Sequence, residues 1–298
     1  MVKLTIGLPT YNCEDIIEDR IKELLGQSFT DYVLIISDNS STDKTREICE
    51  KMTQNDKRVN FFHHEENRGP FWNFNFLLNK ANTPYFIWAA ADDLWSNNFL
   101  EKNIDELEKN ADIVGSTSEM SLFYRDSHNN ENIKILKNID RHQYVSPISG
   151  RIENKIRTLL NFNQSGLIYS VFRTNQLKRV NTYEWCKNDP VWRCPFACLL
   201  GIIKEGDLNV IYEGYIFKHT NKNSTSIIEY MIKQKFRWSR IIFFNFPFTQ
   251  WAFRIIGFKK FFQNFNYFVK LNIKSEFTII TEVCRMCVRK MLGRKKYW

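Results

Sequence analysis

Two adjacent carboxylates, Asp92 and Asp93, end a continuous apolar run over residues 85–91. A run of this length and character is typical of a strand that is buried on both faces of a parallel sheet. Burying unpaired carboxylates is costly, so the pair is expected at the carboxyl end of the strand, where a cation can bind it. The simpler alternative is a polar turn in which one of the aspartates caps the helix that begins near residue 97.

The chain before this pair alternates apolar runs with helix-compatible segments. The apolar runs over residues 4–8, 33–36 and 59–62 predict three earlier strands, with helices between them. Strands that alternate with helices at short spacing are typical of βαβ units and a parallel sheet. The predicted fold class is therefore α/β, with a mostly parallel, Rossmann-like central sheet flanked by helices.

The polar segments that end these strands are expected to meet. Right-handed crossovers place the carboxyl ends of parallel strands on one edge of the sheet, where the ligands of open α/β sheets bind. We therefore expect one crevice formed by Asn12, Asp38, Asn39, Asp92 and Asp93. No Gly-x-Gly-x-x-Gly sequence follows the first strand, and no Walker sequence is present. Both observations disfavour a dinucleotide-binding protein and a P-loop enzyme.

Four short segments carry a family resemblance. They are LPTYN at residues 8–12, SDNSSTD at 37–43, NRG at 67–69 and ADD at 91–93. Their order and spacing resemble those of the family 2 glycosyltransferases, which have a GT-A fold; the combination is specific, although each segment alone is common. The resemblance implies an inverting enzyme that transfers a sugar from a nucleotide-sugar donor to a polysaccharide, glycolipid or lipid-linked acceptor.

The resemblance also implies roles for individual residues. The expected contacts to the nucleotide-sugar are Pro9, Thr10, Tyr11, Asn12, Asp38, Asn39, Arg68, Asn73, Asn75 and Asp92. Asp92, Asp93 and His219 are implied as ligands of a divalent cation, Mn²⁺ or Mg²⁺, that bridges the diphosphate. Such a cation on carboxylate oxygens can neutralise the charge that develops on a diphosphate leaving group. For His219, Asn73 and Asn75, capping or surface roles are the competing interpretation.

Two positions depart from the family pattern. Many members carry a further acid two residues before the first aspartate of the pair, where this chain has Ala90. The upstream pair consists of Asp38 and Asn39 rather than two acids. Both departures bear on which base is recognised and on the geometry at the cation.

A further carboxylate, Asp189, precedes Pro190 and an apolar segment over residues 191–200, which Gly201 follows. Proline in the first turn and glycine at the end predict a helix here, with Asp189 as its N-cap. By the resemblance, the same residue is the general base that takes the proton from the acceptor hydroxyl. A cap position leaves the carboxylate accessible, so the two roles are compatible.

The net charge of +9 is concentrated near the C-terminus. Residues 228–298 hold 15 Lys and Arg against 3 Asp and Glu, a balance of +12, whereas the rest of the chain holds 27 against 30 and carries −3. This segment interleaves aromatic and basic residues and is too interrupted to be a good transmembrane span, but it suits the surface of an anionic membrane. The alternative is a set of helices packed on the catalytic body; no nucleic-acid-binding module matches, so no nucleic-acid partner is expected.

These observations divide the chain into a catalytic domain, residues 1–227, and a basic, aromatic, helical tail, residues 228–298. The catalytic domain comprises a nucleotide-binding half, residues 1–115, and an acceptor half, residues 116–227. The chain opens without the basic segment and apolar core of a secretory signal, and its seven cysteines are interpreted as reduced. We therefore expect a cytoplasmic protein that is peripheral on the inner face of the cell membrane.

Two other functions compete with this prediction. A sugar-phosphate nucleotidyltransferase would need a Gly-rich, basic loop after the first strand, which residues 9–12 do not provide. A non-catalytic membrane scaffold built on a degenerate transferase body is motivated by Ala90 and by the basic tail. Release of nucleoside diphosphate from a sugar donor would exclude the scaffold.

Overall fold

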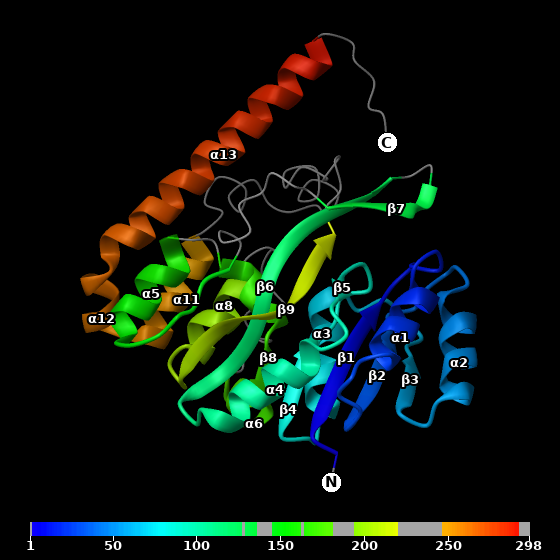
Figure 1. Cartoon of the computed structure of the whole chain (residues 1–298). Coiled ribbons are helices and arrows are strands. Elements are labelled where there is room, and N and C mark those ends of the chain that lie inside the picture. Colours follow the sequence, from blue (N-terminus) through cyan, green and yellow to red (C-terminus); the bar gives the residue numbers. More distant parts are fainter. Residues whose placement is uncertain are drawn as a thin grey trace.

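The structure is a computed structural model that describes residues 2–126, 129–135, 145–161, 164–180, 194–219 and 246–291. Helices flank a curled sheet, and the last helix runs away from the body (Figure 1). The strands are β1 (Leu4–Thr10), β2 (Tyr32–Asp38), β3 (Val59–His63), β4 (Tyr85–Trp88), β5 (Leu94–Trp95), β6 (Ile113–Asp126), β7 (Asn129–Ile135), β8 (Val171–Arg173) and β9 (Asp207–His219). The helices are α1 (Ile17–Leu25), α2 (Thr45–Asn55), α3 (Pro70–Lys80), α4 (Phe99–Lys109), α5 (Ile152–Asn161), the 3-10 helix η2 (Gln164–Tyr169), α6 (Thr174–Arg179), α8 (Cys194–Ile202), α11 (Phe246–Ile256), α12 (Phe258–Gln263) and α13 (Phe265–Met291).

Within the described ranges, the strands form one sheet in the order β3-β2-β1-β4-β8-β6-β9-β5, and β7 pairs with β6. β1 pairs in parallel with both β2 and β4, and β2 pairs in parallel with β3. β8 is antiparallel to β4 and β6, whereas β6 and β9 are parallel. The predicted α/β class with flanking helices is confirmed. The sheet is parallel through its first half and mixed beyond β4.

The central strands are buried because their apolar side chains are covered on both faces. Leu4, Ile6 and Leu8 of β1 are fully buried, as are Phe86 and Ile87 of β4. α3 packs against β1 and β2, and α4 packs against β6 and β9. Burial of apolar surface contributes about 25 cal/mol per Å². This core fixes where each strand ends.

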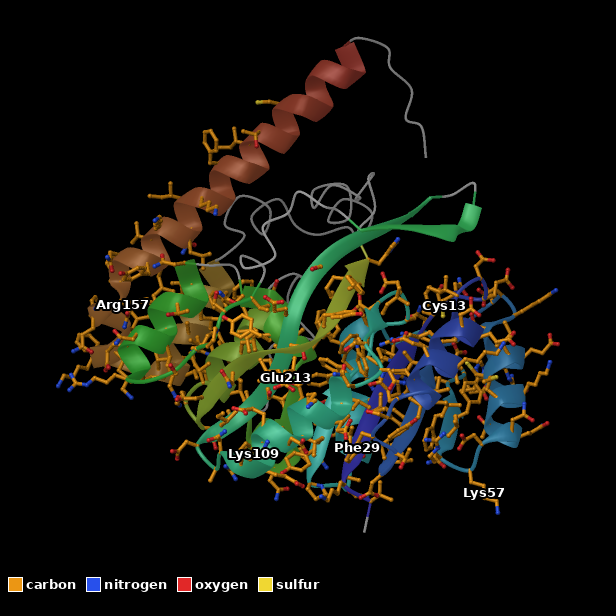
Figure 2. All side chains as sticks on the ribbon, viewed as in Figure 1. Cys13, Phe29, Lys57, Lys109, Arg157 and Glu213 are labelled. Carbon is orange, nitrogen blue, oxygen red and sulfur yellow. The ribbon has the colours of Figure 1, made fainter. Side chains whose placement is uncertain are left out.

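The strand register places polar strand ends side by side. Thr10 at the end of β1 lies opposite Asp38 at the end of β2, and Asp38 lies opposite His63 at the end of β3. The loop that carries the aspartate pair leaves β4, the other neighbour of β1, at the same edge. Cys13 lies at this carboxyl-terminal edge, at the opposite end of the sheet from Lys57 (Figure 2).

Three elements of the second half differ from the sequence predictions. From their sequence, residues 166–173 are expected to form one strand that enters the following helix; the structure shows part of the 3-10 helix η2 and then the short strand β8. The polar, Asn-rich sequence of residues 126–146 predicts a loop without regular structure, but β7 lies within it and pairs with β6. α8 continues through Gly201 to Ile202. The glycine permits close packing there, since a Cβ at position 201 would lie 2.1 Å from Val180 Cγ1.

The helices α11, α12 and α13 pack partly on the body. α11 contacts α8, and α13 contacts α5. Phe248, Phe261 and Phe268 are buried at this junction. The guanidinium of Arg157 on α5 lies 5.7 Å from the centre of the Tyr267 ring (Figure 2). Among the residues that the structure describes, none of the helices combines the length and the apolar character that a membrane span needs.

Candidate active site

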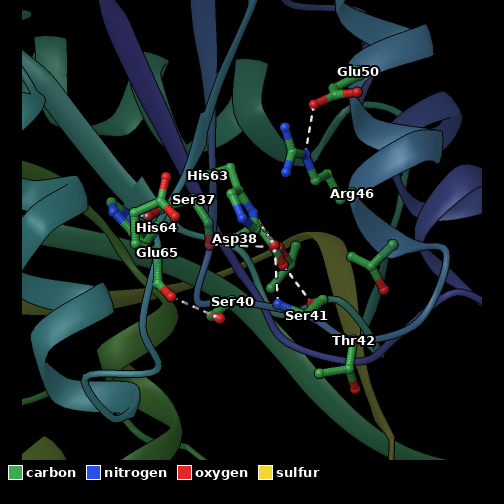
Figure 3. A network of polar contacts seen from close by, with 12 residues as sticks. Ser37, Asp38, Ser40, Ser41, Thr42, Arg46, Glu50, His63, His64 and Glu65 are labelled. Carbon is green, nitrogen blue, oxygen red and sulfur yellow. Dashed lines mark hydrogen bonds and ion pairs between the residues drawn. The ribbon is translucent and has the colours of Figure 1, made fainter.

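Asp38 is the centre of a hydrogen-bond network at the ends of β1, β2 and β3 (Figure 3). Its carboxylate is fully buried. Oδ1 accepts hydrogen bonds from Thr10 Oγ1 at 3.2 Å and from Ser41 Oγ, and Oδ2 accepts one from the Ser41 backbone N–H at 3.1 Å. Oδ2 also lies 2.9 Å from His63 Nδ1. These contacts offset the desolvation of the carboxylate and fix the loop that follows β2.

The loop after β1 is fastened to the same network. Asn12 Oδ1 accepts the backbone N–H of Thr42 at 2.8 Å, and the Asn12 backbone N–H donates to Ser41 Oγ at 2.9 Å. Asn12 and Ser40 have positive φ angles of 46° and 65°, a region that asparagine tolerates better than most side chains. Tyr11 is 49% exposed. An aromatic ring therefore stands open at this edge beside a rigid set of polar groups.

Asn39 connects the loop after β2 to the loop before α3. Its Nδ2 donates to Asn67 Oδ1 at 2.9 Å, and its Oδ1 accepts the backbone N–H of Arg68 at 3.0 Å. Gly69 has a φ of 83° and lets the chain turn sharply into α3. The Arg68 guanidinium lies 4.8 Å from the centre of the Trp72 ring and keeps about half of its surface in solvent.

The remaining residues predicted at the nucleotide differ in their environments. Asn73 is buried, and its Nδ2 donates to the Ser37 carbonyl at 2.8 Å, while its Oδ1 finds no hydrogen-bond partner among the described residues. Asn75 lies on the same helix and is partly exposed. Pro9 lies within β1, next to Thr10. Asn73 thus holds the end of β2 and leaves an unused acceptor inside the protein.

Asp93 is buried and paired, which the sequence did not predict. Lys218 Nζ forms an ion pair with Asp93 Oδ2, and the His219 backbone N–H donates to Asp93 Oδ1 at 3.2 Å. The Lys218 ammonium also lies 3.5 Å from the centre of the Tyr169 ring. Burial by itself lowers the pKa of Lys218, but the interactions with Tyr169 and Asp93 outweigh it and raise the pKa above its ordinary value. Lys218 therefore stays charged, and both carboxylate oxygens of Asp93 are engaged.

Asp92 is the accessible member of the pair. Its side chain is 49% exposed, and its Oδ2 lies 3.4 Å from His219 Nδ1. The two residues belong to segments that pair directly, because β5 is antiparallel to β9, with Leu94 opposite Phe217. Within the described ranges, no group of three or more His, Cys, Asp and Glu side chains gathers around a point that could hold a metal ion. A cation at Asp92 and His219 would therefore need other ligands.

Comparison with known proteins places this geometry in a family. The sequence model described as Glycosyl transferase family 2 matches residues 5–178, which is more than half of the chain. The chain belongs to glycosyl transferase family 2. An uncharacterized glycosyltransferase of Haemophilus influenzae is 31% identical over 160 residues, 54% of this chain and 62% of that protein. The putative teichuronic acid biosynthesis glycosyltransferase TuaG of Bacillus subtilis is 36% identical over 102 residues, 34% of this chain and 40% of that protein. The chain thus spans less than two thirds of the length of these relatives.

Solved structures agree on the architecture of this family 2 chain. The mannosyltransferase PcManGT from Pyrobaculum calidifontis, in complex with GDP-Man and Mn²⁺, has a TM-score of 0.59 at 12% identity over 99% of this chain and 76% of its own. S. aureus TarS 1-349, in complex with UDP-GlcNAc, has a TM-score of 0.57 at 14% identity over 95% of this chain and 92% of its own. At these identities the likeness shows the fold alone, and that fold is GT-A.

Among the predicted residues of this family 2 chain, Thr10, Asn12 and Asp38 lie in one network, and Asp92 and His219 face each other. Asp189 lies outside the described residues. Sequence reasoning missed Lys218, the cation next to His219, because a lysine in a strand has no local pattern that reveals a partner 125 residues away. The available signal in the sequence was the desolvation cost of burying a second carboxylate, which indicates that a positively charged group must lie nearby.

Proposed function

We propose that this family 2 chain transfers a sugar, with inversion, from a nucleotide-sugar donor to a glycan, glycolipid or lipid-linked acceptor of the cell envelope. The observation that carries the proposal is the common edge of β1, β2 and β4, at which the Asp38 network and the exposed carboxylate of Asp92 both lie. The donors in neighbouring structures, UDP-GlcNAc and GDP-Man, support a nucleotide-sugar. Relatives named for teichuronic acid synthesis and for an undecaprenol-linked glucosyl transfer support the acceptor class.

We assign the nucleoside to the edge formed by the loops after β1 and β2. The exposed ring of Tyr11 stands beside the polar groups of Asn12 and Asp38. A flat apolar surface next to a few fixed hydrogen-bonding groups suits a base and its ribose. Arg68, which pairs with the exposed Glu66 at 2.9 Å while about half of its own side chain stays exposed, suits a phosphate at the end of the same loop cluster.

We assign a divalent cation, Mn²⁺ or Mg²⁺, to Asp92 and His219. Their facing carboxylate and imidazole groups fit such an ion, and a site with few protein ligands is usual where substrate phosphates complete the coordination. When bound, the ion supplies positive charge next to the departing diphosphate. Asp93 does not fit as a ligand in the same way, because Lys218 and the His219 backbone already engage its oxygens.

Lys218 and Asp93 hold the aspartate loop, so Asp92 keeps its carboxylate at the accessible edge while the donor is bound. For the acceptor we retain Asp189 as the general base, because an acid before an apolar helix matches the family position. One base and one site for the leaving diphosphate suffice for a single inverting displacement, so a covalent nucleophile is not required.

Release of nucleoside diphosphate tests the transferase. The purified chain is incubated with UDP- and GDP-sugars and Mn²⁺, with and without an undecaprenyl-linked acceptor, and the released UDP or GDP is measured. We expect release from one donor, raised by the acceptor and lost in Asp92→Asn. If no donor is consumed under any condition, the non-catalytic scaffold is the better account.

The role of Asp189 has a separate test. In Asp189→Asn we expect the donor to bind as in the wild type, while transfer falls by about 10²- to 10⁴-fold because the acceptor hydroxyl loses its base. Donor affinity is measured by calorimetry and transfer by release of diphosphate. Transfer at the normal rate would remove Asp189 from the mechanism.

We also propose that the C-terminal helices bind an anionic membrane surface. A row of exposed apolar side chains, the aromatic stripe, runs along α12 and α13 at a spacing of three to four residues: Phe258, Phe262, Phe265, Val269, Ile273, Phe277 and Ile280. Lys259, Lys270 and Lys274 are exposed on the same two helices. Residues 246–291 hold 8 Lys and Arg against 2 Asp and Glu. Apolar side chains for the acyl boundary and cations for anionic headgroups are the features of an interfacial helix.

Vesicle sedimentation tests this surface. The triple variant Phe258→Ser, Ile273→Ser and Phe277→Ser should bind vesicles of phosphatidylglycerol and phosphatidylcholine at least about tenfold more weakly, since each buried side chain contributes on the order of 1–3 kcal/mol. Tyr212→Ser, which removes a 72% exposed aromatic ring from β9, is the matched control and should bind normally. Unchanged binding of the triple variant would refute the proposal.

A further inference from the structure

Arg20 of α1 is an arginine with a side chain that is only 1% exposed. Its Nη1 forms an ion pair with Glu23 Oε2 at 2.5 Å, one helical turn further along. A buried ion pair is seldom more stabilising than well-packed apolar side chains, because both charges lose their hydration. Arg20 is the buried member, while the Glu23 side chain is 21% exposed, so the burial of the Arg20 charge needs a reason other than stability.

Both members of the pair hold the loop that carries Asp92. Arg20 Nε donates to the Ala90 carbonyl at 2.9 Å, and Glu23 Oε1 accepts the backbone N–H of Trp95 at 2.6 Å. The Arg20 guanidinium also lies 4.5 Å from the centre of the Trp95 ring. The two contacts fall on either side of Asp92, so together they fix the path of the backbone through the aspartate pair.

The same helix begins at the loop assigned to the nucleoside. The backbone N–H groups of Ile16 and Ile17 donate to the Cys13 carbonyl, so one short turn over residues 13–16 connects Asn12 to the start of α1. At its far end the connection to the aspartate loop continues, since Gln27 Nε2 donates to the Ser96 carbonyl at 3.0 Å. α1 is therefore a rigid link between the nucleoside loop and the aspartate loop.

The arrangement is not optimised for stability. Arg20 Nη2 and Trp95 Nε1 are both buried, and neither finds a hydrogen-bond partner among the described residues. Unpaired buried donors lower stability. Among the described residues, the side-chain hydrogen bonds of Arg20 and Glu23 join them to each other and to the loop around Asp92, as a positioning role requires.

We propose that Arg20 and Glu23 are positioning residues that hold Asp92 at a fixed place relative to the nucleoside loop, so that a nucleoside diphosphate and its cation bind together. The inference rests on the proposed function of this edge as a nucleotide-sugar site. Arg20 and Glu23 contact the backbone of the loop and not the donor. Their loss should weaken binding of the diphosphate and cation while the nucleoside still binds.

A double variant tests the pair without leaving a buried charge. Arg20→Met with Glu23→Gln removes the ion pair and the bond to Ala90, while the glutamine oxygen can still accept the Trp95 N–H. The control is Arg58→Met with Asp56→Asn. Arg58 likewise pairs with Asp56 at 2.7 Å, lies 5.0 Å from the Tyr32 ring centre and donates to an α1 carbonyl, that of Leu25, away from the aspartate loop.

Hydrogen exchange measures whether the loop is held. In the double variant we expect faster backbone exchange in residues 89–98 and unchanged exchange in β1 and β2. The control variant should leave residues 89–98 as in the wild type. Unchanged exchange of that loop in the double variant would overturn the proposal, and this readout needs no nucleotide.

Nucleotide binding measures whether the Arg20–Glu23 pair matters for the donor. Calorimetry with UDP and GDP in the presence of Mn²⁺ should show affinity lowered by about tenfold or more in the double variant. The reason is the loss of the Arg20–Glu23 ion pair and of the Arg20 hydrogen bond to the Ala90 carbonyl. Uridine and guanosine should bind as in the wild type. Faster exchange with normal diphosphate affinity would make the pair merely structural and overturn the positioning role. If the wild type binds neither diphosphate, the proposed function fails first, and the positioning role fails with it.

Discussion

The loop after β2 and the loop after β4 both present a carboxylate at the same edge of the sheet, but they are held in different ways. Asp38 is fixed by hydrogen bonds from groups that are near it in sequence or in the next strand, such as Ser41 and Thr10. The loop with Asp92 is fixed by two cations, the buried Arg20 and the largely covered Lys218, that come from α1 and β9.

The difference teaches how each loop can be used. Asp38 is itself the centre of its network, so its carboxylate oxygens are already hydrogen-bonded and serve to fix the loop conformation. In the second loop the structural task falls to Asp93 and to the backbone at Ala90 and Trp95. Asp92 is thereby left half exposed, with the His219 ring as its facing group at 3.4 Å. A loop held through its neighbours leaves one carboxylate available for chemistry.

The largest expected effect is at Asp92. Asp92→Asn should lower transfer by about 10³-fold, because the site loses the charge that holds a cation near the leaving diphosphate. Stability should change little, since the side chain is half exposed. Release of UDP or GDP gives the rate, and Asp112→Asn, an exposed carboxylate before β6, is the control. Near-normal transfer in Asp92→Asn would show that the loop after β4 does not provide the carboxylate used in the reaction.

The next largest effect is expected at Lys218. Lys218→Met should lower the free energy of unfolding by about 3–5 kcal/mol, because Asp93 remains buried without its partner. Adding Asp93→Asn should restore much of that loss, since the uncompensated charge is gone. Urea denaturation measures both variants. If the single and double variants are equally unstable, the ion pair does not hold the loop.

A smaller effect is expected at Asp38. Asp38→Asn should lower the free energy of unfolding by about 1–3 kcal/mol, because one amide N–H₂ group must face the donors that the carboxylate now accepts from. Binding of the nucleoside should weaken together with stability, in contrast to Asp92→Asn. Denaturation and nucleoside titration on the same sample separate the two outcomes. Weaker nucleoside binding with full stability would show that Asp38 acts on the ligand and not through its network.

The smallest effect concerns pH. Burial, together with the charge of Arg68, lowers the pKa of His64 below its ordinary value of 6.5. Because the pKa of His64 is lower in the folded state than in the unfolded state, the neutral imidazole contributes to stability above pH 6.5. This contribution is lost as the pH falls through that value towards the folded pKa. Ser37 Oγ, 2.8 Å from His64 Nε2, lies next to β3 at this edge. Between pH 8 and pH 5, the melting temperature should fall less steeply in His64→Gln than in the wild type. An identical slope would exclude His64 as a source of the pH dependence.

The first half of the fold was predictable from the sequence because its signals are local. Apolar runs such as residues 33–36 mark strands, and the polar stretch that begins at Asp38 marks a turn. The second half was less predictable, since β7 pairs with β6 through a polar segment and η2 replaces half of an expected strand. Strand pairing over long distances overrides local preference.

The candidate site divides in the same way. The sequence predicts that Asp92 and Asp93 stand together at a strand end, but it assigns them the same task. In the structure their environments differ, because Lys218 pairs with Asp93 and leaves Asp92 accessible. The sequence could not show this, since Lys218 lies in a strand more than a hundred residues later. Arg20 was equally hidden, since a charged residue on a helix is expected to face solvent unless its partner is known.

The most direct test of the account is whether binding of a nucleoside diphosphate depends on a divalent cation through Asp92. UDP and GDP are titrated by calorimetry into the wild type and into Asp92→Asn, each with Mn²⁺ and with EDTA. The account predicts that Mn²⁺ strengthens binding of one diphosphate to the wild type by about tenfold or more, and that Asp92→Asn binds equally weakly with and without Mn²⁺. Tight binding in EDTA, or full Mn²⁺ dependence in Asp92→Asn, would contradict it.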